Sequence, residues 1–103
     1  MQKPICYWVE TPTIRAMCHI FGGYWEKMSD GDRYTIAWGI TEAVMRVAQG
    51  EQRERLDYLC TQNGHQFHRH NLMLDFLAKL HSELGEYDAR SLSAGILING
   101  PNQ

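Results

Sequence analysis

Apolar side chains recur at helical spacing between Ser29 and Gly50, the longest patterned stretch of the chain. Positions three and four apart share one face of a helix, which has about 3.6 residues per turn. A helix that is apolar over much of its circumference has to be covered from two sides. We therefore expect a central helix on which the rest of the chain packs. Its apolar face includes Ala37, Ile40, Val44, Val47 and Ala48, and Tyr34, Trp38 and Met45 widen it.

Polar residues and glycines mark the ends and the middle of this helix. Ser29 or Asp32 can accept hydrogen bonds from the free N–H groups of the first turn, and Gly50 suits a left-handed closing residue. Gly39 lies inside the helix, where glycine costs about 1 kcal/mol relative to alanine. We expect another backbone or a large ring to approach closely there, and the neighbouring Trp38 is consistent with such crowding.

Further helices are predicted on both sides of the central one. Thr11 and Pro12 are typical of a helix start, and an apolar stripe follows as far as Phe21. A second strong stripe runs from Gln66 to Leu84, and a short helix is expected over residues 88–92. The polar segment after Gly50 carries a smaller buried stripe, made of Leu56, Leu59 and Cys60.

The two ends of the chain are harder to assign. Residues 5–9 combine aromatic and β-branched side chains, which is typical of an extended segment or a strand. Residues 96–98 either end the last helix or form a strand beside residues 5–9, and Asn99-Gly100-Pro101 stops any regular element. The fold class is therefore mainly α, a compact bundle of four to five helices, with a two-stranded pairing of the terminal segments left open. The expected core comprises Ile14, Phe21, Ile36, Ile40, Val44, Leu59, Phe76, Leu77 and Leu80.

Composition narrows the class of protein. A chain of 103 residues is expected to form a single domain, residues 1–103. Its residues are 44% hydrophobic and 21% charged, which is ordinary for a globular protein. A net charge of −2 argues against a general nucleic-acid binder. No apolar run is long enough to cross a membrane, and the first ten residues lack a signal-peptide pattern. Three irregularly spaced cysteines favour a reducing compartment, so we expect a cytoplasmic protein.

One cluster contains residue types that bind metal ions. Cys60, His65, His68 and His70 supply four candidate zinc ligands within eleven residues. The cluster has neither a Cys-x-x-Cys pair nor a His-Glu-x-x-His motif, so our first interpretation is a polar junction between helices with no cofactor. A metal-binding domain that uses these four residues is the alternative.

Other chemistry is less well supported. The chain has no Gly-x-Ser-x-Gly motif and no glycine-rich phosphate loop, so we do not expect an enzyme. The central helix, Gly50 and a helix beginning at Glu51 have the order of a helix–turn–helix nucleic-acid binder. Glu51 and Glu54 would then lie near phosphates, which makes nucleic acid an unfavourable partner.

The aromatic and methionine content suggests a function in binding. Three Trp, five Tyr and five Met are many for a short chain, and these residue types are enriched at protein interfaces. We therefore expect a protein–protein interaction module, a stoichiometric regulator or inhibitor of a larger complex. Small accessory proteins of phages and mobile elements offer an analogy in size and composition only. Another protein is the expected partner, and a homodimer is also compatible. The candidate contact residues are Tyr7, Trp8, Tyr24, Trp25 and Tyr58.

Overall fold

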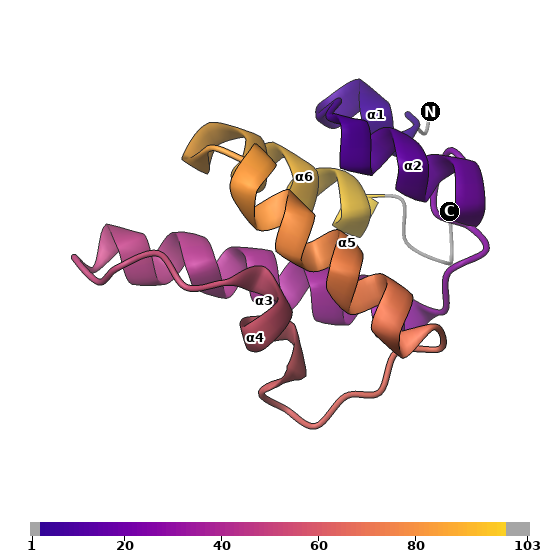
Figure 1. The fold of residues 1–103 in the computed structure, drawn as a ribbon. Helices are drawn as coiled ribbons and strands as arrows, with labels where there is room; N and C mark the ends of the chain where they lie inside the picture. The colour runs from indigo at the N-terminus through magenta and orange to yellow at the C-terminus, as the bar shows by residue number, and fades with distance from the viewer. Residues whose placement is uncertain (1–2, 99–103) are drawn as a thin grey trace.

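Residues 3–98, which are the part of the chain described by the computed structural model, form six α-helices and no β-strand (Figure 1). The chain is mainly α, as the apolar periodicity predicts, but these residues form more helices than the four to five expected. The helices are α1 (Ile5–Trp8), α2 (Pro12–Phe21), α3 (Asp30–Ala48), α4 (Leu56–Thr61), α5 (His70–Glu83) and α6 (Glu86–Ile98).

The ends of α3 agree with the polar signals in the sequence. Ser29 is the N-cap, and its hydroxyl accepts a hydrogen bond of 3.1 Å from the backbone N–H of Asp32. Asp30 and Asp32 place negative charge in the first turn, where the helix dipole favours it. Beyond the last turn, Gly50 has a φ of 87°, a left-handed conformation that strains any residue with a side chain. These caps define α3 as a helix of 19 residues.

The other predicted helices are present with shifted ends. Thr11 caps α2 as expected, and its hydroxyl accepts a hydrogen bond from a backbone N–H of the first turn. α5 begins at His70, one turn later than predicted. α6 continues through Ile98 instead of stopping at Leu92, so residues 96–98 are helical. The predicted stop at Asn99-Gly100-Pro101 lies outside the described residues.

Residues 5–9 do not form the strand that their composition predicts. They form the single-turn helix α1 and its C-cap, and the two terminal segments meet as a packing of α1 on α6. Trp8 of α1 lies against Gly95 of α6, where an added Cβ would come within 2.5 Å of the indole ring. The bare glycine lets the indole approach the α6 backbone, and this packing overrides the strand propensity of the segment.

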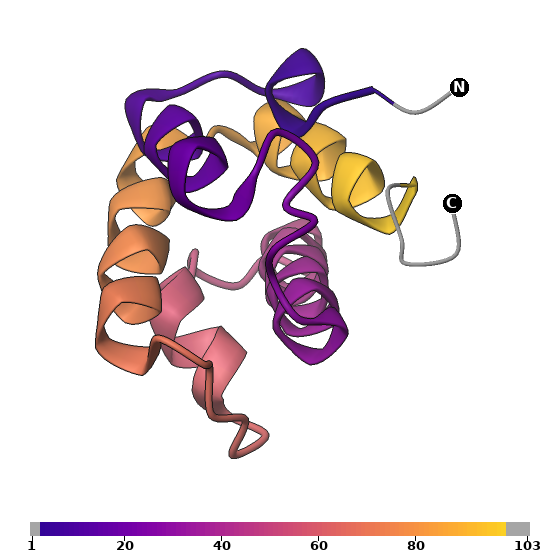
Figure 2. The same ribbon diagram turned by 90° about the vertical axis from the view of Figure 1, so that its right-hand side faces the viewer.

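The six helices of residues 3–98 are arranged as a closed ring in which each helix lies beside two others (Figure 2). The order around the ring is α3, α6, α1, α2, α5 and α4. α3 is covered from two sides, by α4 and α6, as its broad apolar surface predicts. The other three helices do not pack on it, so α3 is one member of a ring and not a centre on which the whole chain packs. Each helix turns one arc of its surface inward and leaves the outward arc to solvent.

The inward arcs form one apolar core. Eight of the nine residues expected there are buried, and the ninth, Val44, is half-buried at the edge. Val47 and Ala48 are exposed, because the last turn of α3 extends past the neighbouring helices (Figure 1). The largest fully buried side chain is Trp25, in the connector between α2 and α3.

A close approach at Gly39 is confirmed, with a different neighbour from the expected one. A Cβ on Gly39 would overlap the Sγ of Cys60, which lies on α4. The nearest atom belongs to neither a backbone nor a large ring, but the backbone Cα of Cys60 also lies 3.6 Å from that point, as expected for a close approach of another helix. Trp38 itself is 37% exposed. Glycine at this position therefore lets α4 pack directly on α3.

Candidate functional site

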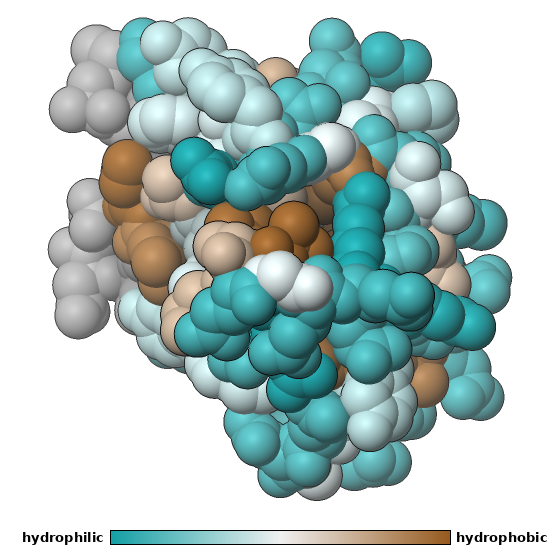
Figure 3. All heavy atoms as spheres, turned by 90° about the vertical axis from the view of Figure 1, so that its left-hand side faces the viewer, coloured by the Kyte–Doolittle hydropathy of each residue, from teal (hydrophilic) through white to brown (hydrophobic). Residues whose placement is uncertain are grey.

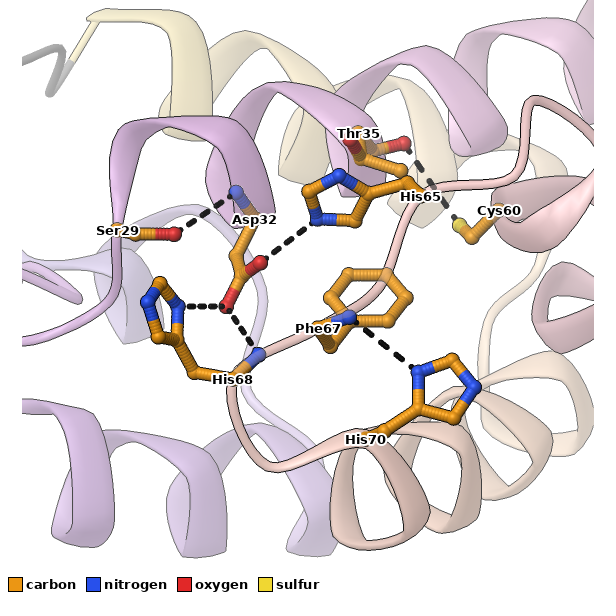
Figure 4. A network of polar contacts seen from close by, with 8 residues as sticks. All are labelled: Ser29, Asp32, Thr35, Cys60, His65, Phe67, His68 and His70. Atoms are coloured by element: carbon orange, nitrogen blue, oxygen red, sulfur yellow. Dashed lines mark hydrogen bonds and ion pairs between the residues drawn. The ribbon is translucent and has the colours of Figure 1, made fainter.

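The most concentrated polar network lies at the first turn of α3 (Figure 4). The Asp32 side chain is only 3% exposed, and its Oδ1 lies 2.7 Å from His65 Nε2. Its Oδ2 accepts a hydrogen bond of 3.4 Å from the backbone N–H of His68 and lies 3.5 Å from His68 Nδ1. A buried carboxylate is costly unless it is hydrogen-bonded, and here both of its oxygens are engaged.

This network fastens the connector between α4 and α5 to α3. His65 and His68 belong to that connector, and Asp32 belongs to α3, so one carboxylate holds two segments that are distant in the sequence. A cleft of about 340 Å³ lies beside the network, and Lys27, Asp32, His68 and Arg69 contribute polar groups to its wall.

The four residues of the metal alternative do not come together. His70 Nδ1 accepts a hydrogen bond of 3.3 Å from the backbone N–H of Phe67, and the Cys60 thiol donates to the carbonyl of Thr35 over 3.7 Å (Figure 4). Burial, and then the negative charge of Asp57, raise the pKa of Cys60 to about 12, so the thiol keeps its proton. Within residues 3–98, no three His, Cys, Asp or Glu side chains are grouped to hold a metal ion.

The helix that the helix–turn–helix alternative places at Glu51 does not form. Residues 51–55 are a connector without helical structure, and the next helix, α4, begins only at Leu56. α4 has six residues, fewer than two turns. The polar segment expected to start a recognition helix therefore does not form one.

The five aromatic residues proposed as contacts have different surroundings. Tyr7, Tyr24 and Tyr58 are exposed, and they belong to α1, to the α2–α3 connector and to α4 respectively. Trp8 is half-buried against α6. Trp25 is fully buried, with a positive φ of 55°, and its carbonyl accepts a hydrogen bond from Arg33, so it belongs to the core and not to a contact surface.

A different set of large apolar side chains is gathered on one line of α3. Tyr34, Trp38 and Met45 are 44%, 37% and 48% exposed, although their periodicity suggests part of a buried face. With Thr41, which is also exposed, they form a row along the outward arc of the helix, which we call the α3 stripe. The steps of four, three and four residues between the members of this row are a signal in the sequence for a separate face of the helix. The residues that face the core lie along another side of the same helix.

The surface beside the α3 stripe is also partly apolar. A shallow groove between α3 and α6 is lined by residues that include Thr41, Val44, Ala94 and Leu97. A second hollow, of about 90 Å³, lies on a different side of α3, against the start of α6, and its wall includes the inward residues Ile40 and Ala43. Figure 3 shows apolar side chains gathered in a hollow of the surface, with polar side chains around it.

Comparisons with protein-family models, with curated proteins and with solved structures find no match to this chain. In residues 3–98, no helix combines the length and the apolar character that crossing a membrane requires. The site is therefore interpreted from its own chemistry and geometry.

Proposed function

We propose that this chain is a protein–protein interaction module that binds its partner through the α3 stripe. The observation that carries the proposal is the exposure of Tyr34, Trp38 and Met45 on one face of a well-capped helix. Burying such side chains against a partner releases about 25 cal/mol for each Å² of apolar surface removed from water. A folded chain that leaves them exposed in a row therefore gains free energy when a partner covers them.

The residue types on the stripe support the proposal. Tyr and Trp are the most frequent binding hot spots, and Met adapts its shape to irregular surfaces. A rigid helix also presents them without a large loss of conformational entropy on binding. A single helix face of this length engages one partner helix or groove at a time, which suits a stoichiometric regulator or inhibitor of a larger complex.

A cytoplasmic location is part of the same proposal. The thiols of Cys6, Cys18 and Cys60 are all free, as expected in a reducing compartment. Tyr7, Tyr24 and Tyr58 remain as exposed residues for secondary contacts, outside the α3 stripe.

An affinity capture from host lysate tests the proposal, with wild type, Trp38→Ser and a control variant as baits. Tyr58→Ser is the matched control, because Tyr58 is an exposed aromatic residue on α4 and not on the stripe. We expect wild type and Tyr58→Ser to retain the same protein, and Trp38→Ser to retain at least tenfold less, as for a hot spot worth about 2 kcal/mol. Equal retention by all three baits would show that the stripe is not the binding surface.

A further inference from the structure

The α3 stripe has the spacing of a coiled-coil seam. Tyr34, Trp38, Thr41 and Met45 are separated by four, three and four residues, and Ala48 continues the series after three more. Alternating steps of three and four are the pattern by which one helix packs along another. All five residues are exposed and none of them is charged. Thr41 lies at the α6 edge of the seam, where its hydroxyl is 2.9 Å from that of Ser93.

The seam is symmetric about a point midway between Gly39 and Ile40. We propose that a second copy of this chain covers the stripe, with the two α3 helices antiparallel about a two-fold axis through that point. This inference rests on the proposed function, because it names the partner of the same stripe. Tyr34 of each copy then packs on Met45 of the other, and Trp38 packs on Thr41.

These pairings match in size and chemistry. The largest side chain of the stripe, Trp38, faces the small Thr41, so the two helices can approach without a clash between large residues. Tyr34 faces the thioether of Met45, and sulfur–aromatic contacts are favourable. A parallel arrangement would place Trp38 against Trp38 and leave Thr41 opposite itself, with alternating crowding and gaps.

The charges beside the seam are compatible with pairing of identical surfaces. A two-fold axis brings the same residues together, so unpaired charges of one sign would repel each other. Glu42 is paired with Arg46 over 3.1 Å on α3, and Glu86 with Arg90 over 2.7 Å on α6. The charged residues on both sides of the seam are therefore neutralised by ion pairs within each copy. A strongly charged partner would meet no excess of the opposite charge there.

The position of α3 in the ring makes the seam accessible. α4 packs on α3 at Gly39, and α6 packs on it at Thr41 and Ala37, where the hydroxyl of Ser93 makes hydrogen bonds. The stripe therefore borders α6 at Thr41, while Tyr34, Trp38 and Met45 are partly exposed beside that contact. Figure 2 shows α3 at the periphery of the ring of helices.

The exposed area indicates a weak dimer. Large aromatic side chains have about 150–250 Å² of surface, so the three large residues of the stripe offer roughly 80 Å² each. Leu97 and the α6 rim enlarge the patch beside them. The total is below the roughly 800 Å² per partner of a standard interface, so we expect a dissociation constant in the micromolar range or weaker.

Sedimentation equilibrium over a series of protein concentrations up to about 1 mM tests whether the dimer forms. We expect the mean mass to rise from 11.9 kDa toward twice that value, in wild type and in Tyr58→Ser. Trp38→Ser should remain monomeric over the same range. A wild type that stays monomeric throughout, or a dimer that Trp38→Ser does not weaken, would overturn the inference.

Disulfide trapping tests the antiparallel register. In a background of Cys6→Ser and Cys18→Ser, Tyr34→Cys and Met45→Cys are prepared separately and oxidised with glutathione disulfide, alone and mixed. The mixture should cross-link at least tenfold faster than either variant alone, because identical positions lie roughly 16 Å apart along the helices, beyond the reach of a disulfide. Equal cross-linking of one variant with itself would overturn the register.

The two proposals can fail separately. A monomeric wild type whose captured partner depends on Trp38 would remove the second copy and keep the stripe as a binding surface. If Trp38→Ser weakens neither the self-association of the chain nor the retention of the captured protein, both proposals are overturned.

Discussion

Gly39 shows how one missing side chain determines the packing of two helices. The Sγ of Cys60 occupies the space in which a Cβ would stand, while the Cys60 Cβ lies 3.6 Å from that position, at ordinary contact distance. The thiol is buried and donates a hydrogen bond to the Thr35 carbonyl, so it has little freedom to move aside. The contact between α3 and α4 therefore depends on this pair of small residues.

Gly39→Ala should destabilise the protein by about 1–3 kcal/mol in urea unfolding, the usual cost of overpacking a core. In a Cys60→Ala background the same substitution should cost nothing, or stabilise by up to about 1 kcal/mol, because alanine is the better helix former. The two substitutions should thus be strongly non-additive. Additive effects would mean that the clash with Sγ is not what excludes a side chain at Gly39.

Glu83 joins α5 to the start of α2 through one carboxylate. Its Oε2 accepts a hydrogen bond of 2.5 Å from the Thr13 hydroxyl, and its Oε1 accepts one of 3.2 Å from the Thr13 N–H. Burial alone would raise the pKa of Glu83, but hydrogen bonds from Thr11 and Thr13 and the charge of Lys79 outweigh it, and the pKa is lowered.

The lowered pKa gives Glu83 a pH-dependent part in stability. A carboxyl group whose pKa is lower in the folded state stabilises that state above its unfolded pKa, and the contribution is lost as the pH falls through the folded pKa. Glu83→Gln should therefore lower the melting temperature at pH 7, and the difference from wild type should shrink below about pH 4. Glu51→Gln, at an exposed position, is the control and should change the melting temperature little at either pH. A Glu83→Gln deficit that persists undiminished into acid would contradict this linkage.

At the scale of elements, α1 depends on the surface that α6 offers it. Helices this short are unstable alone, so the single turn of residues 5–8 is maintained by its packing. Trp8 reaches the α6 backbone at Gly95, where an added Cβ would lie 2.5 Å from Cδ1 and 2.6 Å from Cγ of the indole.

Gly95→Ala should displace Trp8 and loosen α1. We expect a loss of about 1–3 kcal/mol of stability and faster hydrogen exchange in residues 5–9, with the other helices retained. Gly85→Ala is the matched control, because no atom lies within 4 Å of a Cβ at that position. If both substitutions leave exchange in residues 5–9 unchanged, the docking of Trp8 on Gly95 is wrong.

The elements differ in how far the sequence could predict them. α2 and α3 carry local caps, at Thr11 and Ser29, so their starts follow from the residues themselves. α1 has no such signal, because its N-cap Pro4 makes no side-chain hydrogen bond and its composition favours a strand. Distant contacts maintain the turn of residues 5–8, among them Trp8 on Gly95 and the hydrogen bond from the Ile5 N–H to the Gly23 carbonyl, and no local pattern contains that information.

At the scale of the whole molecule, the ring arrangement determines which faces are buried. The periodicity of α3 identifies apolar residues on both its inward and its outward arcs, and cannot say which neighbours cover them. Placing α4 and α6 on the two sides of α3 leaves Tyr34, Trp38 and Met45 in solvent. The surplus of aromatic residues predicts a contact surface without locating it, and the proposed α3 stripe consists of residues other than the five first chosen for such a surface.

The histidine cluster was predicted in part. The sequence predicts a polar junction between helices, and His65 and His68 do form hydrogen bonds with the buried carboxylate of Asp32. Asp32 itself was recognised only as a helix cap, because nothing in its local sequence indicates that a connector more than thirty residues later returns to bind it.

The central claim is that the α3 stripe belongs to the surface and not to the core. The free energy of unfolding of the Trp38→Ser variant tests this claim most directly. It should be measured by urea titration at a concentration where wild type is monomeric. We expect a loss below about 3 kcal/mol, because 37% of Trp38 is exposed and its removal leaves an open surface instead of a closed cavity. A loss of about 3–5 kcal/mol, typical of a buried tryptophan, would mean that Trp38 is a core residue and that the stripe is not available to any partner.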